Sequence, residues 1–90
     1  MVRCVHFITH GRVQGVNFRS FTRATGRSLG LAGWVRNLPD KTVEGVAEGS
    51  SEEIDALLSA LKQGPRFAKV TELEHEEREP SGLSGFEIRH

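Results

Sequence analysis

Two segments with apolar side chains at helical spacing set the strongest limit on how this chain folds. The clearer one is expected to start after Ser50, because Ser50 and Glu53 have the spacing of a capping box. In that motif the hydroxyl and the carboxylate each accept a hydrogen bond from an otherwise unpaired backbone N–H. Gly64 and Pro65 end the segment, and its apolar stripe consists of Ile54, Leu57, Leu58 and Leu61. A helix with one such stripe must pack it against another element.

The other segment lies nearer the N-terminus, and its helical period is carried by Phe18, Phe21, Thr22, Thr25 and Leu29. Gly26 and Gly30 are expected to end this helix. Large aromatic side chains in so small a protein are usually buried. We therefore expect Phe18, Phe21 and Trp34 in the core.

The remaining stretches are typical of β-strands and turns. Strands are expected at residues 2–9, 31–37, 42–48, 67–79 and 86–90, with turns at residues 38–41 and 80–85. Residues 67–79 are so acidic that we place them at the edge of the sheet. The order β-α-β-β-α-β is that of the ferredoxin-like fold, an α+β sandwich with two helices on one face of a mostly antiparallel sheet. We expect one domain over residues 1–90, with the last short strand as an appendage.

Composition excludes several classes of protein. Cys4 is the one cysteine, so no intramolecular disulfide can form, and the four histidines show no metal-site spacing. We interpret Cys4 and His6, which share one strand face, as sheet packing. No stretch approaches the roughly 18 apolar residues of a membrane span, and the first residues lack a signal peptide's apolar run. We expect a cytoplasmic monomer that needs no metal or cofactor and contacts no membrane.

The net charge of zero conceals an uneven distribution. Residues 1–39 contain six arginines and no acid, whereas all twelve acids lie between Asp40 and Glu87. The six other basic residues lie in the second part, so the two parts carry +6 and −6. The first part could face an anionic partner, or the acids could simply solvate exposed faces of the second part. Charge alone leaves both interpretations open.

The connection before the first helix has the features of an anion site. It runs over residues 11–19 between a strand and a helix, where backbone N–H groups and the positive end of the helix dipole are available. Gly15 allows a tight turn, and Arg19 can offer two parallel N–H donors to a phosphoryl group. Neither a Walker A ending nor a GxGxxG motif is present. From spacing alone, a plain glycine-containing loop followed by a solvated arginine is an equal alternative.

Two separated motifs resemble the signatures of the acylphosphatase family. The first is GRVQGVNFR at residues 11–19, and the second is GWVRN at residues 33–37, followed by Val43 and Gly49. Together with the element order and the closing GFEIR at residues 85–89, the resemblance covers almost the whole chain. One departure is Lys41, which stands where the family usually has glycine. If that turn needs a positive φ, lysine costs about 1 kcal/mol there.

The resemblance implies an enzyme that hydrolyses the carboxyl–phosphate bond of a small acyl phosphate to a carboxylate and inorganic phosphate, without a metal. It implies that Arg19 binds the phosphate and that Asn37 orients the attacking water. It further implies a phosphate cradle made by the backbone N–H groups of Gln14, Gly15, Val16, Asn17 and Phe18. Nearby, Arg12 and Arg23 are expected to be solvated rather than to steer anions, and we expect no catalytic role for His10.

Two alternatives use the same fold. One is a noncatalytic anion-binding or regulatory module, which would bind phosphate without turnover. The other is an RNA-binding sheet, which needs exposed aromatic side chains on its central strands. Residues 42–48 contain no aromatic residue and two glutamates. We therefore expect no nucleic-acid partner.

Overall fold

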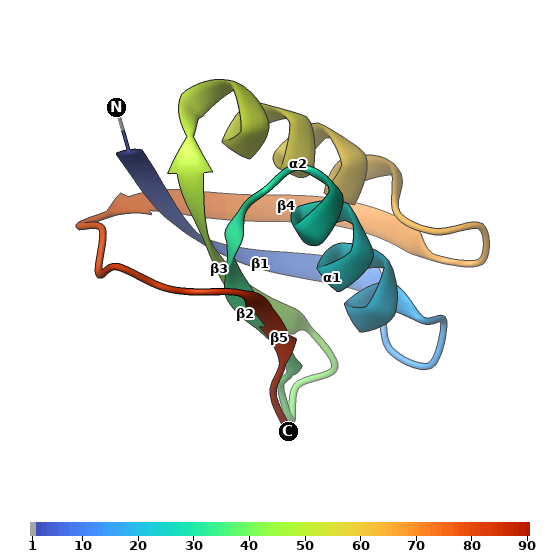
Figure 1. Ribbon diagram of the computed structural model, residues 1–90. Coiled ribbons are helices and arrows are strands. Elements are labelled where there is room, and N and C mark those ends of the chain that lie inside the picture. The colour runs from blue at the N-terminus through green and yellow to red at the C-terminus, as the bar shows by residue number, and fades with distance from the viewer. Residues whose placement is uncertain (1) are drawn as a thin grey trace.

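The chain folds into five strands and two helices in the order that the sequence predicts. The computed structural model describes residues 2–90, and its elements are β1 (Val2–Arg12), α1 (Phe18–Ser28), β2 (Ala32–Asn37), β3 (Val43–Ser50), α2 (Ser51–Gln63), β4 (Lys69–Arg78) and β5 (Phe86–Ile88). The strands form one sheet in the order β4-β1-β3-β2-β5, in which β2 and β5 are parallel and the other pairs antiparallel. Both helices lie on one face of this sheet (Figure 1). The predicted ferredoxin-like α+β fold is confirmed, and the acidic strand β4 lies at an edge.

Alternation along β1 separates the two faces of the sheet. Val5, Phe7 and Thr9 are fully buried on the face that the helices cover. The apolar stripe of α2 packs onto them, since Ile54, Leu57, Leu58 and Leu61 are all buried in the same cluster. The intervening side chains of β1 lie on the other face, where Cys4 is nevertheless buried. In residues 2–90 no helix is long and apolar enough to cross a membrane.

Of the two glycines predicted as stop signals for α1, Gly30 does follow the helix end, whereas Gly26 lies inside the helix. The helix continues to Ser28, and Gly30 has a φ of +72°. Gly26 lies on the buried side of the helix against Phe86, and a Cβ built there would lie 2.5 Å from Cδ2 of that ring. The glycine therefore lets β5 approach α1 closely instead of stopping the helix.

The N-terminus of α2 forms only half of the capping box that the sequence predicts. The Ser50 hydroxyl accepts a hydrogen bond from the Glu53 backbone N–H, as predicted. The Glu53 carboxylate, however, accepts from the Ser50 hydroxyl and not from a backbone N–H. Ser50 is also the last residue of β3, where its backbone pairs with Val2. The residue thus belongs to the sheet and to the helix cap at once.

The prediction that Trp34 lies in the core is wrong. Gly33 and Val35 occupy the helix-covered side of β2, so alternation puts Trp34 on the open face of the sheet, half-buried. There the guanidinium groups of Arg36 and Arg89 lie 5.5 and 4.6 Å from the centre of its ring. Phe18 is in the core, and Phe21 packs against it partly buried.

A buried glutamate fixes the connection from β4 to β5. Glu48 on β3 accepts hydrogen bonds from the backbone N–H groups of Ser81, Gly82 and Leu83, at 2.8, 3.1 and 3.1 Å. These bonds hold an otherwise irregular segment against the sheet. The segment then leads into β5, which completes the sheet beside β2.

Candidate active site

The segment between β1 and α1 leaves its backbone donors free. Gly15 has a φ of +74° and Asn17 a φ of +62°, so the chain turns twice through the left-handed region. Among the hydrogen bonds found in residues 2–90, none has its donor in the backbone N–H groups of residues 14–18. Asn17 precedes α1 without a capping side-chain bond, and the first turn of α1 has no acid. The N–H groups and the helix dipole thus favour an anion at this point.

The side chain of Gln14 ties this loop to the β2–β3 hairpin. Its Nε2 donates to the backbone oxygens of Leu38 and Thr42, both at 2.9 Å. On the other side of the loop, Val13 is buried and Val16 packs against the core. These contacts fix the loop next to the end of β2, where Asn37 pairs with Val43.

The hairpin itself contains the residue that departs from the resemblance. Lys41 donates its backbone N–H to Leu38 and has a φ of +74°, the conformation that favours glycine. The Asp40 carboxylate accepts hydrogen bonds from the Thr42 hydroxyl and from its backbone N–H. These bonds hold the pKa of Asp40 below its usual range. Hydrogen bonds therefore brace the turn despite the lysine.

A cleft of about 390 Å³ opens between the loop, α1, β2 and β5. Five of the predicted site residues line it: Gly15, Asn17, Phe18, Arg19 and Asn37. Gln14 and Val16 do not line it, since their side chains bond to the hairpin and pack on the core. The predicted site residues of α1 and of β2 therefore line the same cleft.

Asn37 contains an unsatisfied polar atom. Its Oδ1 is buried, and within the chain from Val2 to His90 it has no hydrogen-bond partner. A buried acceptor left unpaired costs about 1–3 kcal/mol, so such an atom indicates a missing donor.

The electrostatics of the cleft are positive. Its lining has arginines but no Asp or Glu. Arg19 is half-buried and forms no ion pair with any residue that the structure describes. The cleft therefore suits a ligand with a compact negative charge.

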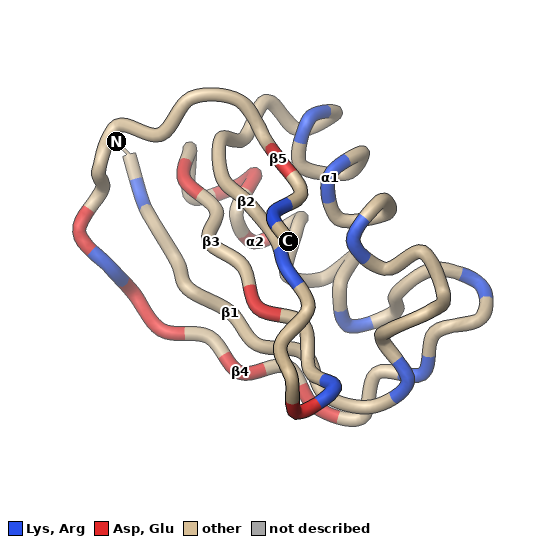
Figure 2. The backbone as a smooth tube through the Cα atoms, turned by 90° about the horizontal axis from the view of Figure 1, so that it is seen from below, with Lys and Arg blue, Asp and Glu red and all other residues tan. Residues whose placement is uncertain are grey.

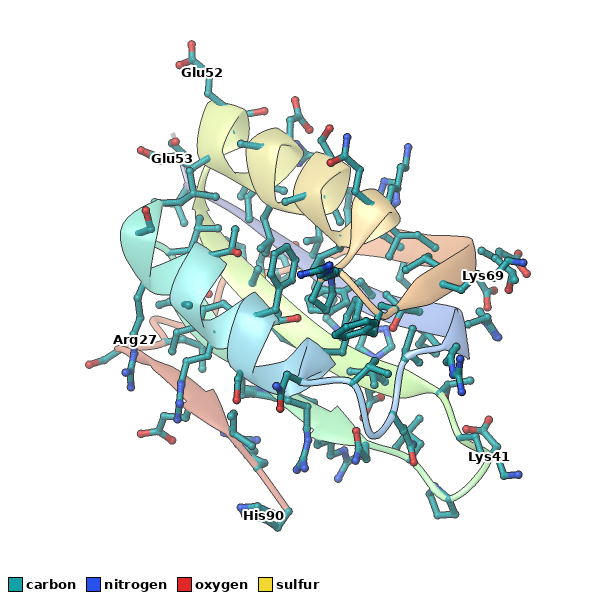
Figure 3. All side chains as sticks on the ribbon, turned by 90° about the vertical axis from the view of Figure 1, so that its right-hand side faces the viewer. Arg27, Lys41, Glu52, Glu53, Lys69 and His90 are labelled. Atoms are coloured by element: carbon teal, nitrogen blue, oxygen red, sulfur yellow. The ribbon has the colours of Figure 1, made fainter. Side chains whose placement is uncertain are left out.

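Sequence reasoning missed five lining residues, namely Val13, Ser20, Arg23, Ile88 and His90. Arg23 was expected to be solvated, but its spacing of four residues from Arg19 on a helix could have placed it. Ile88 and His90 belong to the end of the chain, and Figure 3 shows His90 at the far end of β5. No local signal reveals them, because they reach the site through the parallel pairing of β5 with β2. Arg12 and His10 lie outside the lining.

Comparison with known proteins decides the family. A family model described as acylphosphatase matches residues 5–88. The chain belongs to the acylphosphatase family. An acylphosphatase of Thermococcus kodakarensis is 51% identical over 83 residues, which cover 92% of this chain and 91% of that protein. One from Thermus thermophilus is 47% identical over 81 residues, covering 90% and 92%.

Solved acylphosphatase structures agree with this assignment. The chain is similar to an acylphosphatase from Coxiella burnetii, with a TM-score of 0.95, 39% identity and coverage of 98% of this chain and 93% of that one. The acylphosphatase from Bacillus subtilis gives a TM-score of 0.95 and 38% identity over the full length of both chains. The chain is therefore an enzyme, an acylphosphatase, and not a noncatalytic module.

Proposed function

We propose that this acylphosphatase binds the phosphoryl group with Arg19 and with the backbone N–H groups of residues 14–18, while Asn37 orients the attacking water. The observation that carries the proposal is that Asn37, whose buried Oδ1 is unpaired, lines the same cleft as Arg19 and the free loop. An acceptor of this kind can take a hydrogen bond from a water and fix its direction. Arg19 and the N–H groups supply donors that need no rearrangement during the reaction.

The reaction needs little else from the protein. The water oxygen bonds to phosphorus as the bond from phosphorus to the acyl oxygen breaks, and that oxygen leaves as part of a carboxylate. The carboxylate is a good leaving group, so no covalent nucleophile or metal is required, and binding and alignment account for catalysis. An amide is not a base at neutral pH. We infer that the water's proton passes to a phosphoryl oxygen of the substrate, giving inorganic phosphate.

Phosphate release from benzoyl phosphate in the presence of EDTA tests the proposal. Arg19→Ala and Asn37→Ala should each lower kcat by about 100-fold or more, because each removes a group acting on the transition state. Arg12→Ala removes a neighbouring charge outside the cleft and should keep most of the activity. Full activity in both site variants would refute the assigned roles. Loss of wild-type activity in EDTA would refute metal independence.

We also propose that the protein acts as a monomer in the cytoplasm. Cys4 is the one cysteine of the chain and its thiol is buried, and burial raises its pKa, which suits a protein that uses no disulfide. Among residues 2–90 the exposed large apolar side chains are Val2 and Phe67, which do not form a broad patch typical of an obligate interface. Sedimentation equilibrium tests the oligomeric state, and fractionation of cells tests the compartment.

A further inference from the structure

Three arginines follow one another along α1 at intervals of four residues. They are Arg19, Arg23 and Arg27, and the helix has no acid to balance them. Figure 2 shows these basic positions recurring along α1, whereas acidic positions gather on β4. Like charges at this spacing destabilise a helix by about 0.2–0.5 kcal/mol per pair. The row of arginines therefore adds a small repulsion that an anion beside it would relieve.

The three guanidinium groups have different surroundings. Arg27 donates from Nε to the backbone oxygen of Phe86 at 3.2 Å, so its role is to hold β5. Arg19 and Arg23 both line the cleft, and neither makes a side-chain hydrogen bond or ion pair with another residue of the described chain. By contrast, Arg3 and Arg36 pair with carboxylates at 2.8 and 2.7 Å. Arg23 is thus a half-buried cation in the cleft that pairs with none of the described side chains.

The phosphoryl group does not account for Arg23. Under the proposed function that group is neutralised by Arg19 and the free N–H groups of the loop. Arg23 lies one helical turn farther from the loop, about 6 Å along the helix axis. The cleft continues to this point, with Ser20 and His90 also in its lining. Its volume of about 390 Å³ is at the small end of ligand pockets but exceeds what a phosphoryl group alone occupies.

We propose that Arg23 binds a second anionic group carried by the acyl part of the substrate. The preferred substrates are then acyl phosphates whose acyl group carries its own negative charge, such as a carboxylate. This inference rests on the proposed function, because it uses the same phosphate position. It makes Arg23 a specificity-determining residue that touches the substrate away from the reacting bond.

Matched substrates separate this role from a general effect of positive charge. Benzoyl phosphate is compared with 3-carboxybenzoyl and 4-carboxybenzoyl phosphate, which add one charge at two distances from phosphorus. The wild-type enzyme and the variants Arg23→Gln, Arg23→Lys and Arg12→Gln are assayed on all three. The measured quantity is the ratio of kcat/KM for each carboxylated substrate to that for benzoyl phosphate.

If Arg23 forms a charge-assisted hydrogen bond with the second anionic group, the kcat/KM ratio should fall about 10-fold or more in Arg23→Gln for at least one carboxylated substrate. The fall should come mainly from a higher KM for that substrate. Arg23→Lys should keep part of the preference. Arg12→Gln, which removes a charge from β1 outside the cleft, should leave the ratio unchanged.

The inference would be overturned if Arg23→Gln lowered kcat/KM equally on all three substrates, or did not lower it on any of them. The proposed function is judged separately, by the activity of the wild-type enzyme on benzoyl phosphate and its loss in Arg19→Ala. Urea denaturation of each variant shows whether it is folded, and Arg23→Lys provides a second test should Arg23→Gln be unstable.

Discussion

At the scale of single residues, two side chains occupy backbone conformations that favour glycine, with different consequences. Asn17 lies in the loop before α1 at a φ of +62°, and asparagine tolerates this region better than most residues. Lys41 lies in the hairpin at a φ of +74° and has no such tolerance. The loop therefore adopts its shape at little cost, whereas the hairpin contains a strained position four residues after Asn37.

Replacing Lys41 with glycine should stabilise the protein. Relief of the left-handed conformation outweighs the greater freedom of glycine in the unfolded chain, for a net gain of about 0.5–1 kcal/mol. The midpoint of thermal unfolding should rise by a few degrees, at about 4–8 °C per kcal/mol for a domain of this size. Lys41→Ala keeps a Cβ at the same φ and is the control. An equal rise in both variants would show that the lysine side chain, and not the backbone, is responsible.

At the scale of elements, the contact between α1 and β5 places one wall of the cleft. Gly26 and Phe86 meet on the buried side of the helix, and Arg27 bonds to the Phe86 backbone oxygen. Phe86 is only 1% exposed, so its ring has no room to withdraw. The cleft depends on this contact, because β5 brings Ile88 and His90 to it.

Gly26→Ala should destabilise the protein although alanine is the better helix former. Alanine gains about 1 kcal/mol in helix propensity, but its Cβ would meet the Phe86 ring at 2.5 Å. Overpacking of this kind costs about 1–3 kcal/mol and usually more than the gain. Urea denaturation measures the change.

The partner variant Phe86→Leu makes the prediction specific. The double variant of Gly26→Ala with Phe86→Leu should be more stable than the sum of the single changes predicts, because the smaller side chain leaves space for the Cβ. Additive effects would show that Gly26 matters for a reason other than this contact.

At the scale of the whole molecule, charged networks cross the open face of the sheet. Glu44 on β3 bonds to His6 on β1 at 2.8 Å and to Arg36 on β2 at 2.7 Å. Burial of Glu44 would raise the pKa of its carboxyl, but the hydrogen bonds from His6 and Arg36 outweigh burial and hold the pKa below its usual value of 4.5. On the side of the sheet that faces α2, where Arg3 also bonds to Asp55, the Arg3 guanidinium lowers the pKa of Glu77.

These shifts predict that acid destabilises the protein. A carboxyl whose pKa is lower in the folded state contributes its full stabilisation above about pH 4.5, and this is lost as pH falls through the folded-state pKa. The free energy of unfolding should therefore drop between pH 6 and pH 3. Glu44→Gln should lower stability at pH 6 but reduce the drop, as urea denaturation at both pH values would measure. The exposed Glu79→Gln is the control, and an unchanged drop in Glu44→Gln would exclude the network as a cause.

The sequence predicted most of the fold because its signals are local. The stripe of α2, the cap at Ser50 and the acidic edge strand depend on neighbours within one element, so periodicity and charge reveal them. Gly26 and Trp34 were placed wrongly because their surroundings come from β5 and from the register of β2. A glycine in a helix and a tryptophan in a strand look the same in sequence whichever face they occupy.

For the site, too, some features follow from the sequence and others only from the tertiary structure. By itself the sequence determined a glycine-containing loop followed by Arg19, and the resemblance of its two motifs to a known family pointed to a phosphate role for this loop and to Asn37. Only the tertiary structure decided that Asn37 lies in one cleft with Arg19, that its Oδ1 lacks a partner, and that Arg23 and His90 share the cleft. The physical reason is that backbone conformation follows from adjacent residues, whereas a cleft forms between elements that the sheet brings together from distant parts of the chain.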